Sequence, residues 1–300
     1  MLTRRGVLKT LGGLLAGGVG FASYSLGIEP AWRLSVERYR LTPPRWPAGL
    51  NVRLAVIADL HAGEPYMGPK RIADIVTRAN GLDADAILLL GDFAAGHKWQ
   101  TRPVPADEWS EILSGLKAPL GVHAVLGNHD WWDDRNAQRL GKGPTIGRRA
   151  LERRGIPVYE NAAVRLKKGS APFWLAGLGD QIAFFRGKVG HRQRFQGVDD
   201  LPGTLAKIND DAPIILMAHE PDIFTRVPDR VALTVSGHTH GGQVRLFGYS
   251  PIVPSQFGNR YAYGHIVEGG RNLIVSGGLG CSILPVRFGV PPEITLVDVG

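Results

Sequence analysis

Cysteine is almost missing from this sequence, because Cys281 is the single one among 300 residues. An internal disulfide is therefore excluded, and so is a metal site built on several thiolates. Any metal site must use His, Asp, Glu or Asn side chains. Cys281 itself lies in the apolar run GCSILPV, which predicts a buried structural thiol.

Charge is missing from the apolar segment between Lys9 and Glu29, which approaches the ~20 residues needed to cross a bilayer. A pair of arginines precedes it in TRRGVLK, which is similar to the twin-arginine export signal, with Val7 where that pattern prefers phenylalanine. An ordinary secretory signal or a single anchor helix is the alternative. We expect residues 1–28 to be such a signal or anchor, with the positive end in the cytoplasm and the remainder across the membrane.

Acidic residues are outnumbered, since 27 Asp and Glu stand against 35 Lys and Arg, for a net charge of +8. This excess favours anionic surroundings, which include phosphorylated substrates, membrane headgroups and nucleic acid. No repeat of fixed spacing is present, and the 40 glycines and 21 prolines indicate many tight turns. The length and the hydrophobic content of 44% suit one large domain with an appendage.

Short apolar runs alternate with amphipathic stretches after the first 48 residues. The runs 52–58 and 86–90 are typical of strands covered on both faces. Apolar residues at helical spacing predict one helix from Pro69 to Gly81 and another around Trp109. Further strands are predicted at 122–126, 173–178, 214–218, 232–236, 273–277 and 293–299.

This order of elements predicts an α/β sandwich of sheets flanked by helices, because early βαβ alternation gives way to more closely spaced strands. We divide the chain into the targeting segment 1–28, an N-terminal strand and connector at 29–48, and one domain at 49–300.

Polar residues directly follow five of the predicted strands. They are Asp59 and His61, Asp92, Asn128 with His129 and Asp130, His219, and His238 with His240. Ligands of α/β sheets bind beyond the carboxyl ends of strands, so these groups are expected to meet at one edge. In extended backbone, residues two apart point the same way, which predicts that His238 and His240 face one site together. Nearby glycines would let the backbone turn closely beside a ligand.

Seven metal-binding side chains are more than one ion needs, and two ions sharing one carboxylate would use them all. Two cations ~3.5 to 4 Å apart clamp the attacking and leaving oxygens of a phosphoryl centre and lower the pKa of a bridging water.

The blocks DxH, GD, GNHD, H and GHTH occur in this order between Asp59 and His240 and resemble the calcineurin-like metallophosphoesterase superfamily. The resemblance implies a sandwich of two mixed β-sheets flanked by helices. It also implies a first metal held by Asp59, His61 and His240, a bridging Asp92, and a second metal held by Asn128, His219 and His238.

The same resemblance implies that His129 lies outside the metals, stabilises the transition state and protonates the leaving oxygen, with Asp130 orienting its imidazole. A histidine beside the leaving group is a general-acid arrangement. A carboxylate behind an imidazole fixes its tautomer.

The C-terminal region from HTHGGQVRLFG onward is similar to exported or membrane-attached bacterial phosphoesterases. Some relatives there cleave the pyrophosphate of UDP-diacylglucosamine, so a lipid-linked substrate is implied by analogy. The resemblance therefore predicts a hydrolase of phosphomonoesters, phosphodiesters or pyrophosphates that uses two divalent metal ions. The ligands select weakly among Mn, Fe and Zn.

Two other functions stay open on the same fold: a non-catalytic metal-binding scaffold, and a secreted nucleotide phosphodiesterase or nuclease. We expect a phosphorylated small molecule or lipid, the membrane surface and the twin-arginine machinery as partners, and no nucleic acid.

Aromatic and basic residues outside these blocks are candidates for substrate contact. They are Trp131, directly after GNHD, and Phe184, Phe185 and Arg186, in the segment 181–195. We expect that segment to be a loop acting as a substrate or membrane lip. Packing of the tryptophan across the metal loop and an ordinary solvated loop are the alternatives.

Overall fold

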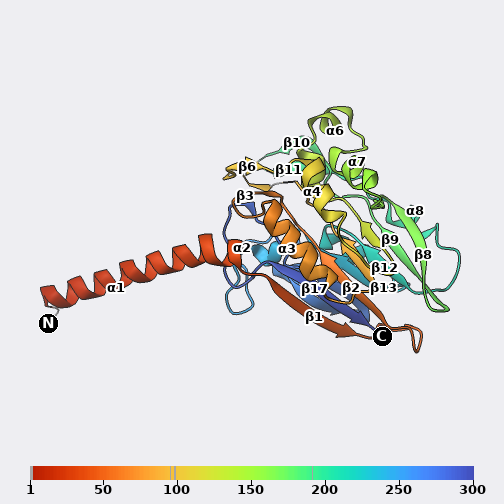
Figure 1. The fold of residues 1–300 in the computed structure, drawn as a ribbon, viewed down its shortest axis with the longest axis horizontal. Helices are drawn as coiled ribbons and strands as arrows, with labels where there is room; N and C mark the ends of the chain where they lie inside the picture. Colours follow the sequence, from red (N-terminus) through yellow and green to blue (C-terminus); the bar gives the residue numbers. More distant parts are fainter. Residues whose placement is uncertain (1–2, 95, 98, 191) are drawn as a thin grey trace.

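Two β-sheets pack face to face in the computed structural model, which describes residues 3–94, 96–97, 99–190 and 192–300 (Figure 1). The first sheet has the order β1-β17-β2-β4-β7, formed by Ser35–Leu41, Glu293–Val299, Val52–Ile57, Ala86–Leu89 and Val122–Ala124. The second has the order β14-β15-β13-β12-β9-β8, formed by Gly264–Glu268, Arg271–Val275, Val231–Ser236, Ile214–Met217, Ala171–Gly177 and Ala162–Lys168. Each contains parallel and antiparallel neighbours, so both sheets are mixed.

Alternation along the strands separates two cores. In β2, Leu54 and Val56 are buried between the two sheets, while Ala55 and Ile57 are buried beneath helices. Successive side chains of a strand point to opposite faces, so a run that is apolar throughout can fill both cores. The inter-sheet core is completed by β9, β12 and β13, which contribute residues such as Leu175.

Helices cover the outer face of each sheet. The first is covered by α3 (Pro69–Asn80), α4 (Ala106–Leu113) and α7 (Ile146–Arg153), and the second by α8 (Leu201–Leu205) and the 3₁₀ helices η2 (Pro221–Arg226) and η4 (Gly258–Tyr261). Helix α3 begins at a proline, and its buried face repeats at helical spacing through Ile72, Ile75 and Val76. The expected α/β sandwich of two mixed sheets flanked by helices is confirmed.

Short elements connect these layers. They are the pairs β3–β6 (Gly63–Glu64, Arg102–Pro103), β5–β16 (Gly96–His97, Ser282–Ile283) and β10–β11 (Phe184–Val189, Arg192–Gln196), with α5 (Asn128–Trp132), α6 (Arg135–Leu140) and η3 (His240–Gly242). The segment expected as a loop at 181–195 is thus mostly an antiparallel hairpin, with Phe185 opposite Phe195. Gly187 and Gly190 have φ of 80° and 59°, which allows the hairpin to bulge and turn.

Several predicted elements end one to three residues earlier than expected. The strand at 122–126 ends at Ala124, and the helix around Trp109 ends at Leu113, where Ser114 and Gly115 bond back to the last turn. Such shifts of a few residues lie at element ends, where local patterns are weakest.

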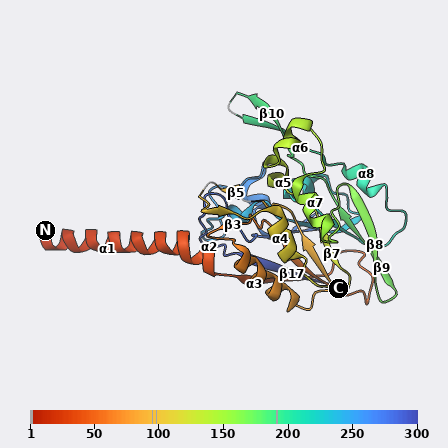
Figure 2. The ribbon, with the colours of Figure 1, turned by 45° about the horizontal axis from the view of Figure 1, so that its top comes forward.

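An N-terminal helix extends away from the sandwich (Figures 1 and 2). It runs through α1 (Arg4–Ser23), the π-helical turn η1 (Tyr24–Ile28) and α2 (Glu29–Trp32). By length and composition this helix could cross a membrane, and a signal sequence would have the same length and composition. Few of its residues are buried against the rest of the protein. Strand β1 follows directly and pairs in parallel with the last strand of the chain.

The inter-sheet core predicts a stability difference between two leucines. Leu175 is 0% exposed, so Leu175→Ala should lower the free energy of unfolding by about 2 to 5 kcal/mol through lost burial and a residual cavity. Leu140, on α6, is 59% exposed, and Leu140→Ala should change it by less than about 0.5 kcal/mol. Urea unfolding followed by circular dichroism measures both values, and equal losses would contradict the described core.

Candidate metal centre

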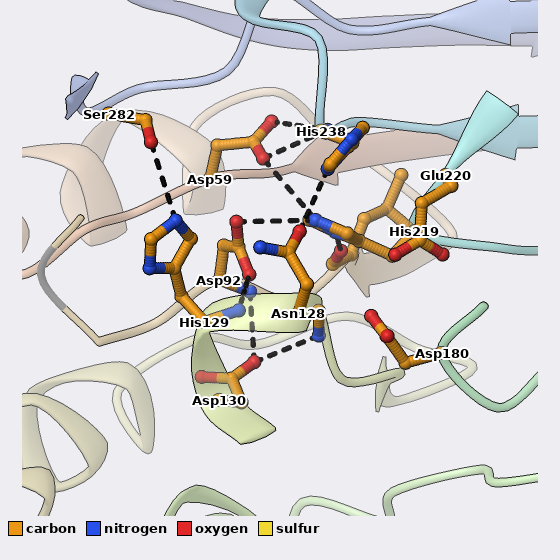
Figure 3. A network of polar contacts seen from close by, with 12 residues as sticks. Asp59, Asp92, Asn128, His129, Asp130, Asp180, His219, Glu220, His238 and Ser282 are labelled. Carbon is orange, nitrogen blue, oxygen red and sulfur yellow. Dashed lines mark hydrogen bonds and ion pairs between the residues drawn. The ribbon is translucent and has the colours of Figure 1, made fainter. Parts of the chain in front are cut away.

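Five strand ends from both sheets meet at one edge of the sandwich. Strands β2, β4 and β7 are parallel neighbours in the first sheet, and β12 and β13 are parallel neighbours in the second. Their carboxyl ends therefore deliver side chains to the same place (Figure 3). The structure brings all seven predicted ligands together there: Asp59, His61, Asp92, Asn128, His219, His238 and His240.

The ligands form two clusters of three. One consists of Asp59, His61 and His240, and the other consists of Asp92, His219 and His238. Within each cluster the candidate ligand atoms lie within 4.8 Å of one another. This grouping is the one that the sequence resemblance implies.

Asp92 lies between the two clusters. Its Oδ2 is 3.6 Å from His61 Nε2 in the first cluster and 3.3 Å from His219 Nε2 in the second. Asn128 Oδ1 lies 2.8 Å from His238 Nδ1, which adds an amide oxygen to the second cluster. The arrangement fits a bridging carboxylate with one ion on each side.

Backbone carbonyls orient two of the imidazoles. His61 Nδ1 lies 2.9 Å from the carbonyl oxygen of Ala94, and His219 Nδ1 lies 2.6 Å from that of Leu90. A carbonyl only accepts, so each Nδ1 carries the proton and each Nε2 presents a lone pair to the centre. Both rings are therefore prepared to bind a cation.

Burial of charge in the centre requires cations. Burial raises the pKa of Asp59 to about 7 and lowers the pKa of His61 to about 3. Burial also opposes ionisation of Asp92, but nearby imidazoles, above all that of His219, hold its pKa well below the usual range. His219 Nε2 is buried and makes no hydrogen bond within the described residues. Two buried carboxylates with imidazole nitrogens around them fit divalent metal ions.

The ligands reach the centre on left-handed backbone rather than on extended strands. Asp59, His61, Asp92, His238 and His240 have φ between 46° and 69°. His238 and His240 both face the centre, as expected, but they do so from left-handed backbone instead of an extended segment, and their rings belong to different clusters. Non-glycine residues rarely adopt such backbone, and it concentrates where function requires it.

Two glycines make room for the bridging region. A Cβ on Gly127 would lie 2.3 Å from Asp92 Oδ1, and one on Gly237 would lie 2.7 Å from Asp59 Oδ2. Any side chain at either position would displace a carboxylate of the centre.

His129 lies beside the clusters but belongs to neither. Its backbone N–H donates to Asp92 Oδ1 at 2.8 Å, and its ring packs edge-on against His61 with a centroid distance of 5.0 Å (Figure 3). Ser282 Oγ lies 3.4 Å from His129 Nε2. Burial opposes protonation of His129, but the charges of Asp92 and Asp133 raise its pKa above the usual value.

The predicted orienting carboxylate is replaced by another. Asp130 accepts hydrogen bonds from the backbone N–H groups of Asp92, Phe93 and Gly127 at 2.9 to 3.0 Å, so it fixes the metal-binding loops instead of the imidazole. Asp133 Oδ2 lies 3.5 Å from His129 Nδ1. The i, i+4 spacing in a helix places Asp133 there, and that spacing is the signal that could have identified it.

Two of the four predicted substrate contacts are in the core. Trp131 and Phe184 are each 1% exposed and pack with a ring distance of 5.2 Å, which excludes them from contact with a substrate outside the fold. Arg186 is exposed on β10 and donates to Gln196 at 2.6 Å. Phe185 is exposed on the same hairpin.

An aromatic cluster formed by Trp132, Phe185 and Phe195 lies next to His129. The Trp132 ring is 5.2 Å from that of His129, 4.9 Å from that of Phe185 and 5.3 Å from that of Phe195. Its indole N–H donates to the carbonyl of Ile182 at 2.8 Å. The hairpin is thereby connected to the histidine through Trp132 rather than through the predicted Trp131.

A cavity of about 340 Å³ opens on the other side of His129. Its lining includes Ala62, Trp109, His129, Asp133 and Ile146. A mostly apolar cavity with a few polar groups beside the reactive centre is typical of a substrate site.

Three further polar residues support the centre without being predicted. Arg287 is fully buried, donates to the carbonyls of Gly280 and Val290, and lies 3.3 Å from His240 Nδ1. Asp180 and Glu220 form a buried pair behind His219, and burial together with the charge of Glu220 raises the pKa of Asp180 well above its usual value (Figure 3). They lie outside the recognised blocks, so no local pattern marked them.

Comparison with known proteins agrees with this geometry. The profile of the calcineurin-like phosphoesterase family matches residues 52–242. The chain is 29% identical to metallophosphoesterase YkuE of Bacillus subtilis, over 98% of this chain and 96% of that protein. It is 28% identical to phosphodiesterase YaeI of Escherichia coli over the full length of both.

A vertebrate relative is also similar. It is a transmembrane protein with metallophosphoesterase domain from Danio rerio, 27% identical over 83% of this chain and 53% of that protein. The profile match covers more than half of the chain and includes each of the seven ligands. The chain belongs to the calcineurin-like phosphoesterase family and is a metal-dependent phosphoric ester hydrolase.

Proposed function

We propose that the chain is a dinuclear metal-dependent phosphoesterase that hydrolyses a phosphodiester, phosphomonoester or pyrophosphate bond of a lipid-linked substrate outside the cytoplasm. The observation that carries the catalytic part is the pair of ligand clusters with Asp92 between them and His129 alongside. The Escherichia coli relative is named a phosphodiesterase, which supports a diester. UDP-diacylglucosamine is one substrate of the proposed chemistry.

Membrane attachment belongs to the proposal. The apolar helix through residues 4–32 supports it, as do relatives named transmembrane proteins. Arg4 and Arg5 at its start support export by the twin-arginine route, which would place the domain at 49–300 on the non-cytoplasmic side.

The seven ligand side chains would hold the metal ions, and Asp92, which lies within reach of both clusters, would contribute to both sites. Bound divalent ions supply Lewis acidity toward phosphoryl oxygens and acidify a bound water. His129, protonated on Nε2 with help from Asp133, donates that proton to the leaving oxygen. Ser282 holds the same nitrogen toward the opening of the centre.

Removing the metal should destabilise the protein. At free metal of 100 times Kd, binding adds about 2.7 kcal/mol to the folded state, so EDTA should lower Tm and added Mn²⁺ should restore it. Asp92→Asn should abolish most of this Mn²⁺ response. Asp85→Asn, which replaces a carboxylate at the amino end of β4, should keep the full Mn²⁺ response. Differential scanning fluorimetry checks the three proteins, and a full response in Asp92→Asn would refute the bridging role.

His129→Ala should separate catalysis from metal binding. We expect hydrolysis of a phosphodiester with a poor leaving group, in the presence of Mn²⁺, to fall about 10² to 10⁴-fold, because the general acid is lost, while metal content stays the same. The matched control is His265→Ala, which replaces a histidine on β14 that forms a hydrogen bond with Asn272 on β15. Normal hydrolysis in His129→Ala would refute the role of this histidine, and a metal-loaded unmodified chain without hydrolysis would favour the scaffold alternative.

Asp133→Asn should shift the pH profile. The Asp133 carboxylate helps to raise the pKa of His129, so the variant should lose the protonated imidazole at lower pH than the unmodified chain does. The alkaline limb of kcat should therefore move toward acid for a phosphodiester with a poor leaving group. Asp107→Asn, in a carboxylate paired with Arg153 on α7, serves as control. An alkaline limb unchanged by Asp133→Asn, or moved toward base, counts against the assignment.

A further inference from the structure

The end of the long N-terminal helix is seated on one segment near the C-terminus. Phe21 packs on Phe288 with ring centroids 4.8 Å apart. The backbone N–H of Arg287 donates to the carbonyl of Ser25 at 2.9 Å, and that of Val290 donates to the buried Glu29 carboxylate at 3.0 Å. Residues 287–290 thus fix the place where the helix leaves the body.

Two loops adjoin this seat. The loop 243–252 is bonded to it, because Arg245 N–H donates to the carbonyl of Phe288 at 2.8 Å. The strand β16 is bonded to the same loop, because Gln243 donates to the carbonyl of Leu284 at 3.0 Å and accepts from Ser282 N–H at 2.6 Å. Both loops belong to the blue part of the chain, which borders the base of α1 in Figure 1.

These loops expose large apolar side chains around the helix base. We call them the apolar rim: Trp99, Leu246, Phe247, Tyr249, Ile252, Ile283 and Leu284. Trp99 belongs to it because β5 pairs with β16, placing His97 opposite Ile283. Single exposed apolar residues are ordinary, whereas a contiguous group beside an apolar helix marks a contact surface.

Two of the exposed apolar residues of the rim, Phe247 and Ile283, also have left-handed backbone, which their side chains disfavour. Leu246 and Tyr249 close a two-residue turn in which Phe247 and Gly248 have φ of 49° and 80°. Turns of this kind favour Asn, Asp or Gly, yet the first central residue here is a fully exposed phenylalanine. Ile283 is 75% exposed with φ of 64°, which is an outlier for a β-branched residue. In the described ranges, Phe247 and Ile283 are the apolar residues with positive φ.

The rim also borders the metal centre. Ser282, whose hydroxyl lies 3.4 Å from His129 Nε2, is the neighbour of Ile283 in β16. A surface that covers Ile283 therefore lies one residue along the chain from the contact between Ser282 and His129.

We propose that the apolar rim rests in the phospholipid bilayer that the N-terminal helix enters, and holds the His129 side of the metal centre at the headgroup layer. The helix identifies the occupant, because its seat on residues 287–290 fixes where an apolar span long enough for a bilayer begins. The inference deepens the proposed membrane attachment and rests on it. It assigns the membrane contact to the rim rather than to the hairpin of β10 and β11.

The test measures depth in the membrane with the full-length protein. In a Cys281→Ser background, Phe247→Cys, Ile283→Cys and Asp211→Cys are each labelled with bimane and reconstituted into phosphatidylcholine and phosphatidylglycerol vesicles that contain doxyl-labelled lipid. Asp211 is exposed at the amino end of β12, away from the rim, and is the matched control. We expect loss of most bimane fluorescence at positions 247 and 283 and no loss at 211.

The failures are distinguishable. Protein that floats with the vesicles but shows no lipid quenching at 247 and 283 overturns the rim contact and leaves the attachment standing. Protein that does not float overturns both the attachment and the rim contact. Hydrolysis of bis-p-nitrophenyl phosphate by the same samples reports the catalytic proposal separately, because that substrate is soluble.

Discussion

Two carboxylates buried at the junction of the two sheets, Asp59 and Asp92, constrain the rest of this structure. Each is almost inaccessible to water, and an isolated buried charge is very costly. The loops that carry them are bonded together, with Asp59 N–H donating to the carbonyl of Gly91 at 3.1 Å and His61 N–H to that of Asp92 at 2.9 Å. The sandwich can hold both charges only because its strand ends supply imidazoles and space for cations.

Asp130 connects these carboxylate loops to the helix that carries His129. It joins the loop after β4 to the start of α5 by accepting from four backbone N–H groups, and burial raises its pKa to about 7. The same helix carries Asn128 into the second cluster and His129 to its edge. The positions of Asn128 and His129 thus depend on one short helix, and loss of Asp130 would disturb both together.

Much of this site could be predicted from the sequence, because apolar runs that end in polar residues mark both strands and ligands. The partner of His129 could not, since Asp130 and Asp133 are equally plausible carboxylates until the helix turn is known. The prediction that Trp131 contacts the substrate failed for a similar reason, since Trp132 is the tryptophan whose ring lies beside His129. Adjacent residues of a helix point about 100° apart, so one ring entered the core and the other reached the site.

The sequence did not predict left-handed backbone, which occurs both in the metal centre and in the apolar rim. Five ligands and two exposed apolar residues, Phe247 and Ile283, adopt it although their side chains disfavour it. Contacts inside the folded chain do not account for either group: the ligands leave a buried imidazole nitrogen without a hydrogen bond, and the rim leaves rings in water. Strained backbone of this kind concentrates at active sites and at ligand-binding sites. In the proposed arrangement cations complete the metal centre and the bilayer covers the rim, which would place catalysis and membrane contact on one continuous edge.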